Sequence, residues 1–289
     1  MVAPMLTLDQ VKSSETWRNL APGFHIGDAA YLKSATALDL GPNRREELMG
    51  QLRFDGYFHE SGVDLGIDHA AMVTTVRALS AAGILPVFAF VFDEFWVPFH
   101  KLHPWYAGLL GDYAMLPAFW VWNLEPSKGD AGWAPHRDKG HMALLPDGSP
   151  RALTTWIPLS PSLPLNGCMY IVPASADPAY GTPNDNQIRF ELPAIRALPA
   201  QPGDVLMWNQ AVLHWGGRTS PRAPHSRVSM AFEFQQTGTA PYYEPPLKPR
   251  AFIPFEQRLT LIANQILRYR HMYKFDPATV AVAEKLAVA

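Results

Sequence analysis

The sequence is poor in cysteine, in charge and in long apolar runs. Of its 289 residues only Cys168 is a cysteine, and only 17% are charged. A single cysteine cannot form an intramolecular disulfide, and residues 1–20 lack the cationic flank and apolar run of a signal peptide, so we expect a cytoplasmic protein. No segment approaches the ~20 uninterrupted apolar residues that span a bilayer, which argues against a membrane protein. With a net charge of -2 and no Lys/Arg cluster, nucleic acid is not an expected partner.

Hydrophobic residues, in contrast, make up 48% of the chain, which is enough for a large core. We therefore predict a single domain over residues 1–289. It would have a helical N-terminal part (1–115), a β-barrel core (116–237) and C-terminal helices (250–289). The 28 prolines lie between apolar runs rather than in one block, as in a chain of many short strands and loops.

Helical patterns lie toward both ends of the chain. Acidic residues in the first turn favour a short helix over Asn43–Arg53. Asp68 can cap a second helix, whose apolar residues recur at helical spacing until Gly83. An apolar stripe over Phe255–Tyr269 predicts a helix that lies against the β core, and Asp276 followed by proline can begin a final helix.

Short β-branched and aromatic segments, separated by Gly, Pro, Asn and Asp, dominate the middle of the chain. We predict eight strands, over residues 118–123, 133–138, 152–159, 169–172, 195–198, 205–208, 212–215 and 227–235. This pattern is typical of a mainly β fold with flanking helices, in which two antiparallel sheets form a jelly roll. Asn166-Gly167 favours a hairpin turn before the fourth strand.

The stretch Trp133–Asp138 carries the first indication of chemistry. In an extended strand His136 and Asp138 point to the same side, because side chains alternate between the two faces. These two groups are part of the 2-His-1-carboxylate set that holds non-haem Fe(II) and leaves positions open for other ligands. His214, which precedes a glycine turn, could supply the missing histidine if the two segments converge at one end of the barrel.

The last predicted strand has one apolar and one polar face. Val228, Met230, Phe232 and Phe234 form the apolar face, and we expect it to pack under the helices. The polar face, with Arg227, Ser229, Ala231 and Glu233, would then line the cavity. A buried guanidinium requires a bidentate carboxylate partner, so Arg227 predicts a dicarboxylate ligand, with Arg218 as the alternative anchor.

The motifs together resemble the phytanoyl-CoA dioxygenase family. They occur in the family's order, between about residues 120 and 235: Trp133–Asp138, Thr155–Leu159, Leu165–Met169, Val172–Ser175, Pro202–Leu206, and His214 followed by Arg227. The resemblance implies a double-stranded β-helix, a cupin-like barrel, with Fe(II) and the cosubstrate 2-oxoglutarate. It implies His136, Asp138 and His214 as iron ligands and Arg227 as the partner of the distal carboxylate. Ser229 is similar to a serine of related dioxygenases, and Asn123 and Thr155 are our further candidates for 2-oxoglutarate contacts.

An Fe(II)- and 2-oxoglutarate-dependent dioxygenase uses O2, releases succinate and CO2, and hydroxylates its substrate, here expected to be a small or medium organic molecule. Relatives that chlorinate have a small residue in place of the carboxylate, so Asp138 favours hydroxylation; desaturation and ring closure stay open. The alternatives are a non-catalytic iron- or 2-oxoglutarate-binding barrel and a cupin-like metal-dependent isomerase or lyase. Arg227 argues against the isomerase or lyase, which needs no dicarboxylate anchor.

The sequence departs from the family in two regions. Residues 176–185 lack a histidine that commonly follows the serine, and residues 88–105 match no motif of the family. The aromatic run Phe90–Tyr106 and the loop Ala174–Gln187 could form a lid over the iron site, although the aromatics could equally be packing residues. His141 and His225 are expected to be surface residues, and Cys168 a buried hydrophobe.

Overall fold

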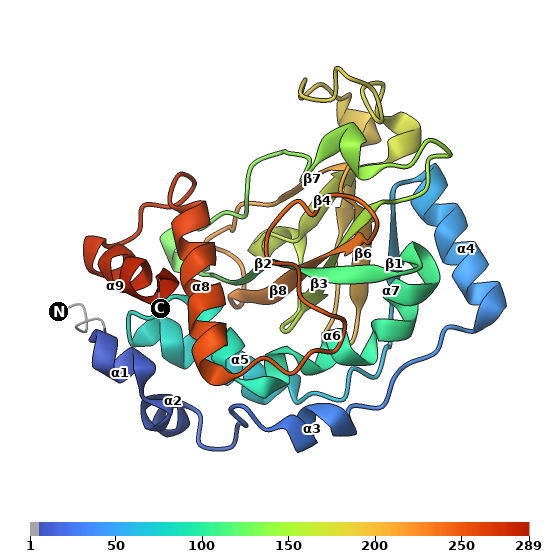
Figure 1. Cartoon of the computed structure of the whole chain (residues 1–289). Helices are drawn as coiled ribbons and strands as arrows, with labels where there is room; N and C mark the ends of the chain where they lie inside the picture. Colours follow the sequence, from blue (N-terminus) through green and yellow to red (C-terminus); the bar gives the residue numbers. More distant parts are fainter. Residues whose placement is uncertain (1–5, 289) are drawn as a thin grey trace.

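The computed structural model describes residues 6–288, so the first five residues of the N-terminal part and Ala289 lie outside the described residues. Two antiparallel sheets form the centre of the fold, a double-stranded β-helix with flanking helices (Figure 1). The larger sheet has the order β1-β6-β3-β8-β2 and the smaller one the order β5-β4-β7. The strands are β1 (Tyr57–Glu60), β2 (Tyr113–Leu124), β3 (Ala152–Pro158), β4 (Met169–Val172), β5 (Arg196–Leu198), β6 (Val205–Asn209), β7 (Leu213–Gly216) and β8 (Arg227–Gln236).

Helices precede and follow the strands, as the sequence predicts. Asp68 caps α5 by accepting a hydrogen bond from the Ala71 amide at 2.9 Å, and Asp276 caps α9 in the same way through the Ala278 amide at 2.7 Å. The helices are α1 (Leu8–Lys12), α2 (Ser14–Leu20), α3 (Ala29–Ser34), α4 (Gly41–Phe54), α5 (His69–Ala81), α6 (Val97–Lys101), α7 (His103–Leu110), α8 (Phe255–Tyr269) and α9 (Pro277–Ala287). Within residues 6–288, no helix combines the length and the apolar character that crossing a membrane requires.

The outer face of the large sheet is covered by these helices and by a 3-10 segment, η1 (Pro86–Val91) (Figure 1). The predicted apolar face of β8 is confirmed, because Val228, Met230, Phe232 and Phe234 are all fully buried in this core. A second, smaller cluster that includes Trp156, Ile171 and Leu206 fills the space between the two sheets. The arrangement leaves the opposite face of β8 turned toward the inside of the barrel.

The aromatic run Phe90–Tyr106 belongs to the outer core. The ring of Phe232 lies 6.0 Å from that of Phe90, 5.6 Å from that of Trp96 and 5.1 Å from that of Phe99. All residues of the run are described, and none of them lines the pocket inside the barrel. The interpretation of this segment as a lid is therefore wrong, since its aromatic side chains contribute to stability by packing under the sheet.

Two local predictions are corrected by the structure. Residues 133–138 form no continuous strand, because only isolated bridges, such as His136 with His214, connect this segment to the small sheet. The structure still has eight strands, since β1, which is not among the eight predicted strands, takes the place of this segment in the count. The turn at Asn166-Gly167 is not a hairpin, because β3 belongs to the large sheet and β4 to the small one. Gly167 alone of the pair has the positive φ, at 84°, and it ends a 3-10 turn that crosses between the sheets.

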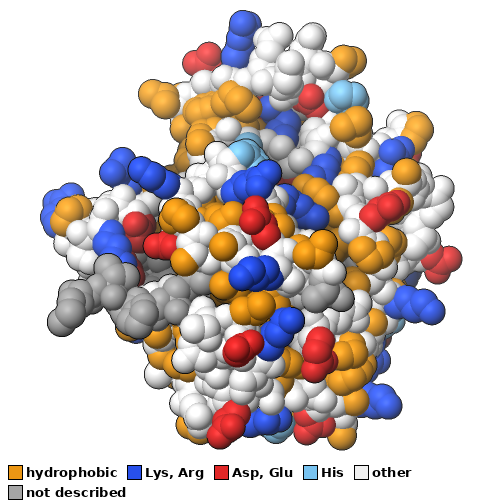
Figure 2. Space-filling model, turned by 60° about the vertical axis from the view of Figure 1, so that its left-hand side comes forward, with side chains coloured by type: hydrophobic (Ala, Val, Ile, Leu, Met, Phe, Trp, Pro, Cys, Tyr) orange, Lys and Arg blue, Asp and Glu red, His pale blue; other side chains and the backbone are white. Residues whose placement is uncertain are grey.

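On the face of the molecule shown in Figure 2, basic and acidic side chains are interspersed with apolar ones. This face has no continuous basic patch of the kind that neutralises a phosphate backbone. The mixed surface agrees with the small net charge of the chain.

Candidate metal centre

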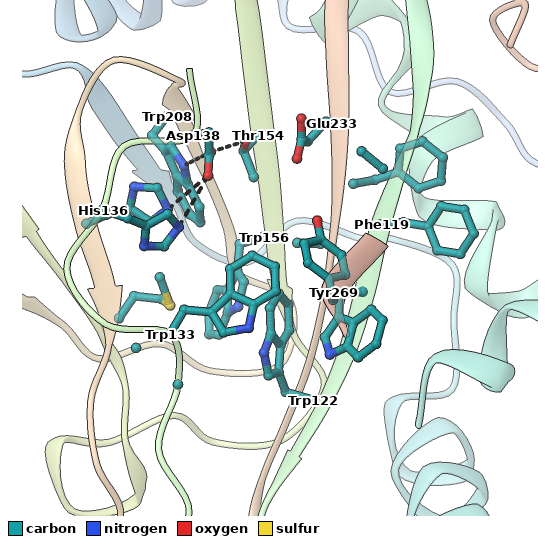
Figure 3. A pocket seen from close by; sticks show the side chains of 18 of the residues that line it. Phe119, Trp122, Trp133, His136, Asp138, Thr154, Trp156, Trp208, Glu233 and Tyr269 are labelled. Atoms are coloured by element: carbon teal, nitrogen blue, oxygen red, sulfur yellow. Dashed lines mark hydrogen bonds and ion pairs between the residues drawn. The ribbon is translucent and has the colours of Figure 1, made fainter. Parts of the chain in front are cut away.

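Three side chains converge at one end of the barrel. The ligand atoms of His136, Asp138 and His214 all lie within 4.8 Å of one another (Figure 3). The Nε2 atom of His136 is 3.4 Å from Oδ1 of Asp138, and that of His214 is 3.6 Å from the same oxygen. Two imidazole nitrogens and one carboxylate oxygen thus face a common point, which is the donor set of a facial triad.

Backbone pairing sets the distance between the two histidines. The amide of His136 donates to the carbonyl of His214, and the amide of His214 donates to the carbonyl of His136, both at 3.0 Å. This reciprocal pair fastens the 133–138 segment beside β7 and brings the two rings to 4.4 Å between centroids. Further along, Gln210 accepts a hydrogen bond from the Lys139 amide at 2.9 Å, so that Asp138 lies between two anchored points.

The outer nitrogen of each histidine is occupied by a backbone carbonyl. Nδ1 of His136 lies 2.7 Å from the Ala134 oxygen, and Nδ1 of His214 lies 3.1 Å from the Val212 oxygen. A carbonyl can only accept, so both Nδ1 atoms must carry the proton, and both Nε2 atoms present a lone pair to the centre. Nε2 of His136 is buried and makes no hydrogen bond with the described residues. The arrangement fixes the tautomer that a metal requires.

The carboxylate of Asp138 is oriented in a comparable way. Its Oδ2 accepts hydrogen bonds from the Thr154 hydroxyl at 2.7 Å and from the Trp208 indole at 3.2 Å. The other oxygen, Oδ1, faces the two histidines. Thr154 and Trp208 come from the neighbouring strands β3 and β6, so the large sheet holds the carboxylate in place. Outer hydrogen bonds of this kind orient metal ligands and tune their basicity.

Electrostatics favour the metal-binding protonation states of Asp138 and His214, but not that of His136. Burial alone would raise the pKa of Asp138, but the two imidazoles and the Thr154 hydroxyl outweigh it and hold the pKa well below its usual range. Burial lowers the pKa of His214 to about 4, so its ring is neutral near pH 7. Burial also lowers the pKa of His136, but the neighbouring Asp138 outweighs burial, so the pKa of this ring is raised above its ordinary value. His136 therefore releases its proton less readily than His214.

A buried cation lies deeper in the same pocket. Arg227, at the start of β8, is 1% exposed, and within residues 6–288 no carboxylate lies within 4.0 Å of it. Its NH1 donates a weak hydrogen bond to the sulfur of Met169 at 3.6 Å, and its guanidinium lies 5.5 Å from the centre of the Trp156 ring. Its Nε makes no hydrogen bond with any described residue. Burial lowers the pKa of this side chain to about 10, which expresses the cost of an unpaired charge.

The other residues predicted for the site fall into two groups. Ser229 shares the inward side of β8 with Arg227, and its buried hydroxyl makes no hydrogen bond with described residues. Asn123 and Thr155 are corrections, since neither lines the pocket. Asn123 points outward and donates to the Ser80 hydroxyl of α5 at 3.1 Å, and Thr155 faces Tyr106 in the outer core. For Thr155 the expectation was off by one residue, which in a strand reverses the face.

Three positions of the site escaped the sequence analysis, and a fourth, Glu233, was predicted only to face the cavity. Thr154 and Trp208 orient Asp138, while Glu233 and Tyr269 line the pocket. The strict alternation of β3 could have indicated Thr154, and Glu233 was already assigned to the inward face of β8. No local signal marks Tyr269, which reaches the pocket from α8. Arg218, the alternative anchor, is exposed, and neither His141 nor His225 belongs to the cluster of ligand atoms.

The pocket that joins these groups has largely aromatic walls. His136 is the more accessible of the two clustered histidines, with 27% of the side chain exposed, whereas His214 is 4% exposed. Its aromatic residues come from the large sheet, from the 133–138 segment and from α8: Phe119, Trp120, Trp122, Trp133, Trp156, Trp208, Phe232 and Tyr269 (Figure 3). A pocket lined mainly by aromatic residues, with a few polar groups, is typical of a small-molecule site.

Comparison with known proteins agrees with this architecture. The structure of the epimerase SnoN from nogalamycin biosynthesis in complex with Fe3+, alpha ketoglutarate and nogalamycin RO superimposes with a TM-score of 0.52 at 20% identity, over 72% of this chain and 96% of SnoN. The non-heme monooxygenase ThoJ superimposes with a TM-score of 0.53 at 14% identity, over 82% of this chain and 99% of ThoJ. At these identities the likeness concerns the fold. No curated protein matches the sequence.

The sequence is also similar to a known family over part of its length. Residues 99–226 match the profile of the family described as phytanoyl-CoA dioxygenase (PhyH). This stretch contains the three clustered side chains His136, Asp138 and His214 and ends one residue before Arg227. The part of the chain that bears the cluster is therefore similar to the phytanoyl-CoA dioxygenase family.

Proposed function

We propose that the protein is an Fe(II)- and 2-oxoglutarate-dependent oxygenase that hydroxylates a small or medium organic substrate and releases succinate and CO2. One observation carries the proposal: a preorganised His-Asp-His cluster and a buried, unpaired arginine line the same pocket. The SnoN complex, whose fold is similar, holds Fe3+ and alpha ketoglutarate, which supports these ligands for the present chain.

The cluster fits Fe(II) by its chemistry. Two neutral imidazoles and one carboxylate match the preference of Fe(II) for nitrogen and oxygen donors, and three ligands leave room for other groups. Nε2 of His136 is buried without a hydrogen bond, which is costly unless a ligand takes its lone pair. In all three side chains, the polar atom that faces away from the centre is already hydrogen-bonded, so little ordering of the side chains is needed when the metal binds.

The arginine fits the distal carboxylate of 2-oxoglutarate. Arg227 lies in the same pocket as the cluster, and its fork of donors lacks a carboxylate partner within the described part of the chain. A carboxylate would accept two parallel hydrogen bonds and neutralise the buried charge. Ser229, two residues further on the same face, has an unused hydroxyl that could add a third.

When bound, iron and 2-oxoglutarate together supply the O2 activation and decarboxylation that side chains cannot perform. The protein's own task is to position and to exclude water. Asp138 and the two histidines fix the metal, Arg227 fixes the far end of the cosubstrate, and aromatic residues such as Trp133 and Tyr269 surround the remaining space. A C–H bond held in this space would meet the oxidant in a fixed orientation.

The test is succinate formation from 2-oxoglutarate under air, with and without Fe(II) and in the presence of ascorbate. We expect slow, iron-dependent release even without substrate, faster release with a substrate, and a product that has gained one oxygen atom. His214→Ala should abolish the release, whereas His225→Ala, outside the cluster, should retain it.

Two results would contradict the proposal. Binding of iron and 2-oxoglutarate without succinate above the iron-free control, across a panel of substrates, would favour a non-catalytic binding protein. A product of unchanged mass formed with succinate release would indicate isomerisation by the same site rather than hydroxylation.

A further inference from the structure

A second buried charge in the pocket has no role in holding iron or 2-oxoglutarate. Glu233 lies on the inward face of β8, six residues after Arg227, and it is paired with Thr154 of the neighbouring strand β3. Its side chain lines the pocket near Thr154 and Asp138 (Figure 3). The same strand thus presents a cation at one end of the pocket and an anion at the other.

One oxygen of Glu233 is held and the other is free. Oε2 accepts a hydrogen bond from the Gln210 amide at 2.9 Å, and the same nitrogen of Gln210 lies 3.2 Å from the Thr154 hydroxyl. No donor within residues 6–288 is hydrogen-bonded to Oε1. The residue is 9% exposed, and this exposure is toward a pocket. The carboxylate of Glu233 is therefore oriented by the same hydrogen-bond network that supports Asp138, and its Oε1 is available to accept a hydrogen bond from a ligand.

The negative charge is not compensated by a contact. Within the described part of the chain, no Lys, Arg or His nitrogen lies within 4.0 Å of Glu233. Lys139 and Arg268 are close enough to act on it electrostatically, but Lys139 donates to the Tyr243 hydroxyl and Arg268 to the Pro117 carbonyl. Burial outweighs them and raises the pKa of Glu233 to about 7.

Iron and 2-oxoglutarate would leave this charge unbalanced. The charges of a metal dication, Asp138, the cosubstrate dianion and Arg227 cancel, so none of these groups neutralises Glu233, and the two cations that act on it from a distance, Lys139 and Arg268, donate to other partners. A substrate hydroxyl could donate to Oε1 but would not neutralise it, and a second carboxylate would be repelled. An ammonium group would do both, and the aromatic walls, which include Tyr269 and Trp133, favour a cation over their faces.

We infer that Glu233 is the substrate-recognition residue of this pocket and that the substrate carries a basic amine, whose ammonium group binds Oε1. The inference rests on the proposed function. It restricts the substrate to amines small enough to share this pocket with 2-oxoglutarate. The amine lies beside the metal cluster, so the C–H bond presented for reaction belongs to a carbon near the nitrogen or to the apolar portion attached to it.

The experiment uses the whole protein loaded with Fe(II) and 2-oxoglutarate under anaerobic conditions, at about pH 8 so that Glu233 is ionised. The probes are sets of matched compounds that differ only in the polar group: 2-phenylethylamine with 2-phenylethanol and 3-phenylpropionate, and cyclohexylmethylamine with its alcohol and acid. Binding is followed by the fluorescence of the pocket tryptophans, and coupling by succinate release under air. The variants are Glu233→Gln, which keeps the shape, and Glu191→Gln, an exposed control.

In the wild-type protein, the amines should bind more tightly than their alcohols and acids. Glu233→Gln should weaken amine binding about 10- to 150-fold, the range expected for a lost hydrogen bond between charged groups, and leave the alcohols unchanged. The 2-oxoglutarate constant should stay the same in both variants, and Glu191→Gln should behave as the wild type.

The inference is wrong if no amine binds more tightly than its counterparts, or if Glu233→Gln preserves the preference. These failures are separable from that of the proposed function, because iron and 2-oxoglutarate binding is measured first through the charge-transfer absorption of their chelate. Absence of that absorption would overturn the proposed function itself. Should Glu233→Gln be unstable, Glu233→Asp must retain a preference for amines, since it keeps the charge; loss of that preference also contradicts the inference.

Discussion

The guanidinium of Arg137 lies 2.5 Å from the carboxylate of Asp177, and both side chains are buried, at 3% and 0% exposure. Arg137 stands between His136 and Asp138 in sequence and points away from them. Its NH1 also donates to the Asp185 carbonyl at 2.5 Å. The segment that bears two of the clustered side chains is thereby fastened to the loop Ala174–Gln187. None of these loop residues, all of them described, lines the pocket.

Removal of one partner from this ion pair should be costly. Asp177→Ala leaves the Arg137 charge buried, and we expect a loss of about 3–5 kcal/mol in the free energy of unfolding, with weaker iron binding because the segment loosens. Urea unfolding and iron titration measure the two effects. The exposed pair Arg53 and Asp147 provides the control, since Asp147→Ala should cost much less than Asp177→Ala. Equal losses in the two variants would show that burial of the Arg137 pair is energetically irrelevant.

The carboxylate of the cluster should be indispensable for the metal. Asp138→Ala removes the only anionic donor of the set, so we expect a large loss of Fe(II) affinity and no succinate formation. Iron titration and the succinate assay test both statements. Full activity of Asp138→Ala would place the metal elsewhere in the protein.

The hydrogen bond from Thr154 to Asp138 should tune the metal rather than hold it. Thr154→Val preserves the size of the side chain but removes the 2.7 Å bond to Oδ2. We expect a loss of about 10- to 100-fold in iron affinity, as for other outer-shell partners of metal ligands. Thr155→Val, on the opposite face of β3, is the matched control and should leave iron affinity unchanged. If both variants bind iron equally well, the Thr154 bond does not orient the carboxylate.

The planar fork of Arg227 should matter more than its charge. Arg227→Lys keeps the charge but cannot form two parallel hydrogen bonds, so 2-oxoglutarate should bind about 5- to 150-fold more weakly while iron affinity barely changes. Arg218→Lys, at an exposed position, should alter neither constant. An unchanged 2-oxoglutarate constant combined with lower activity would instead assign Arg227 to the substrate.

The stability of the protein without ligands should carry the signature of Glu233. Burial raises its pKa from 4.5 to about 7 in the folded protein, so between these values the folded state retains a proton that the unfolded chain has released. This group therefore lowers the free energy of unfolding as the pH rises from about 4.5 to about 7. Glu233→Gln removes the effect and should stabilise the protein by on the order of 2–3 kcal/mol more at pH 8 than at pH 4. Urea unfolding at the two pH values checks this, and a pH-independent difference would contradict it.

The local patterns of the sequence determined most of the secondary structure. Helical periodicity indicated α5 and α8, and alternation identified the two faces of β8, because each pattern reflects which side chains must leave water. The spacing of His136 and Asp138, together with the position of His214, was sufficient to propose a metal cluster. The order of these motifs was also sufficient to indicate the resemblance to the phytanoyl-CoA dioxygenase family.

What lies across the barrel from a residue was decided only by the tertiary structure. The segment 133–138 is held by two backbone bonds to His214 instead of a continuous ladder, and no local pattern distinguishes the two. Thr154 rather than Thr155 faces Asp138 because the register of β3 against β6 and β8 sets the inward face. In the same way, only the packing of distant segments on the sheets places Phe90–Tyr106 outside the large sheet and Tyr269 at the pocket. Side-chain burial depends on which distant strands and helices meet, and that is a property of the assembled sheets, not of any one segment.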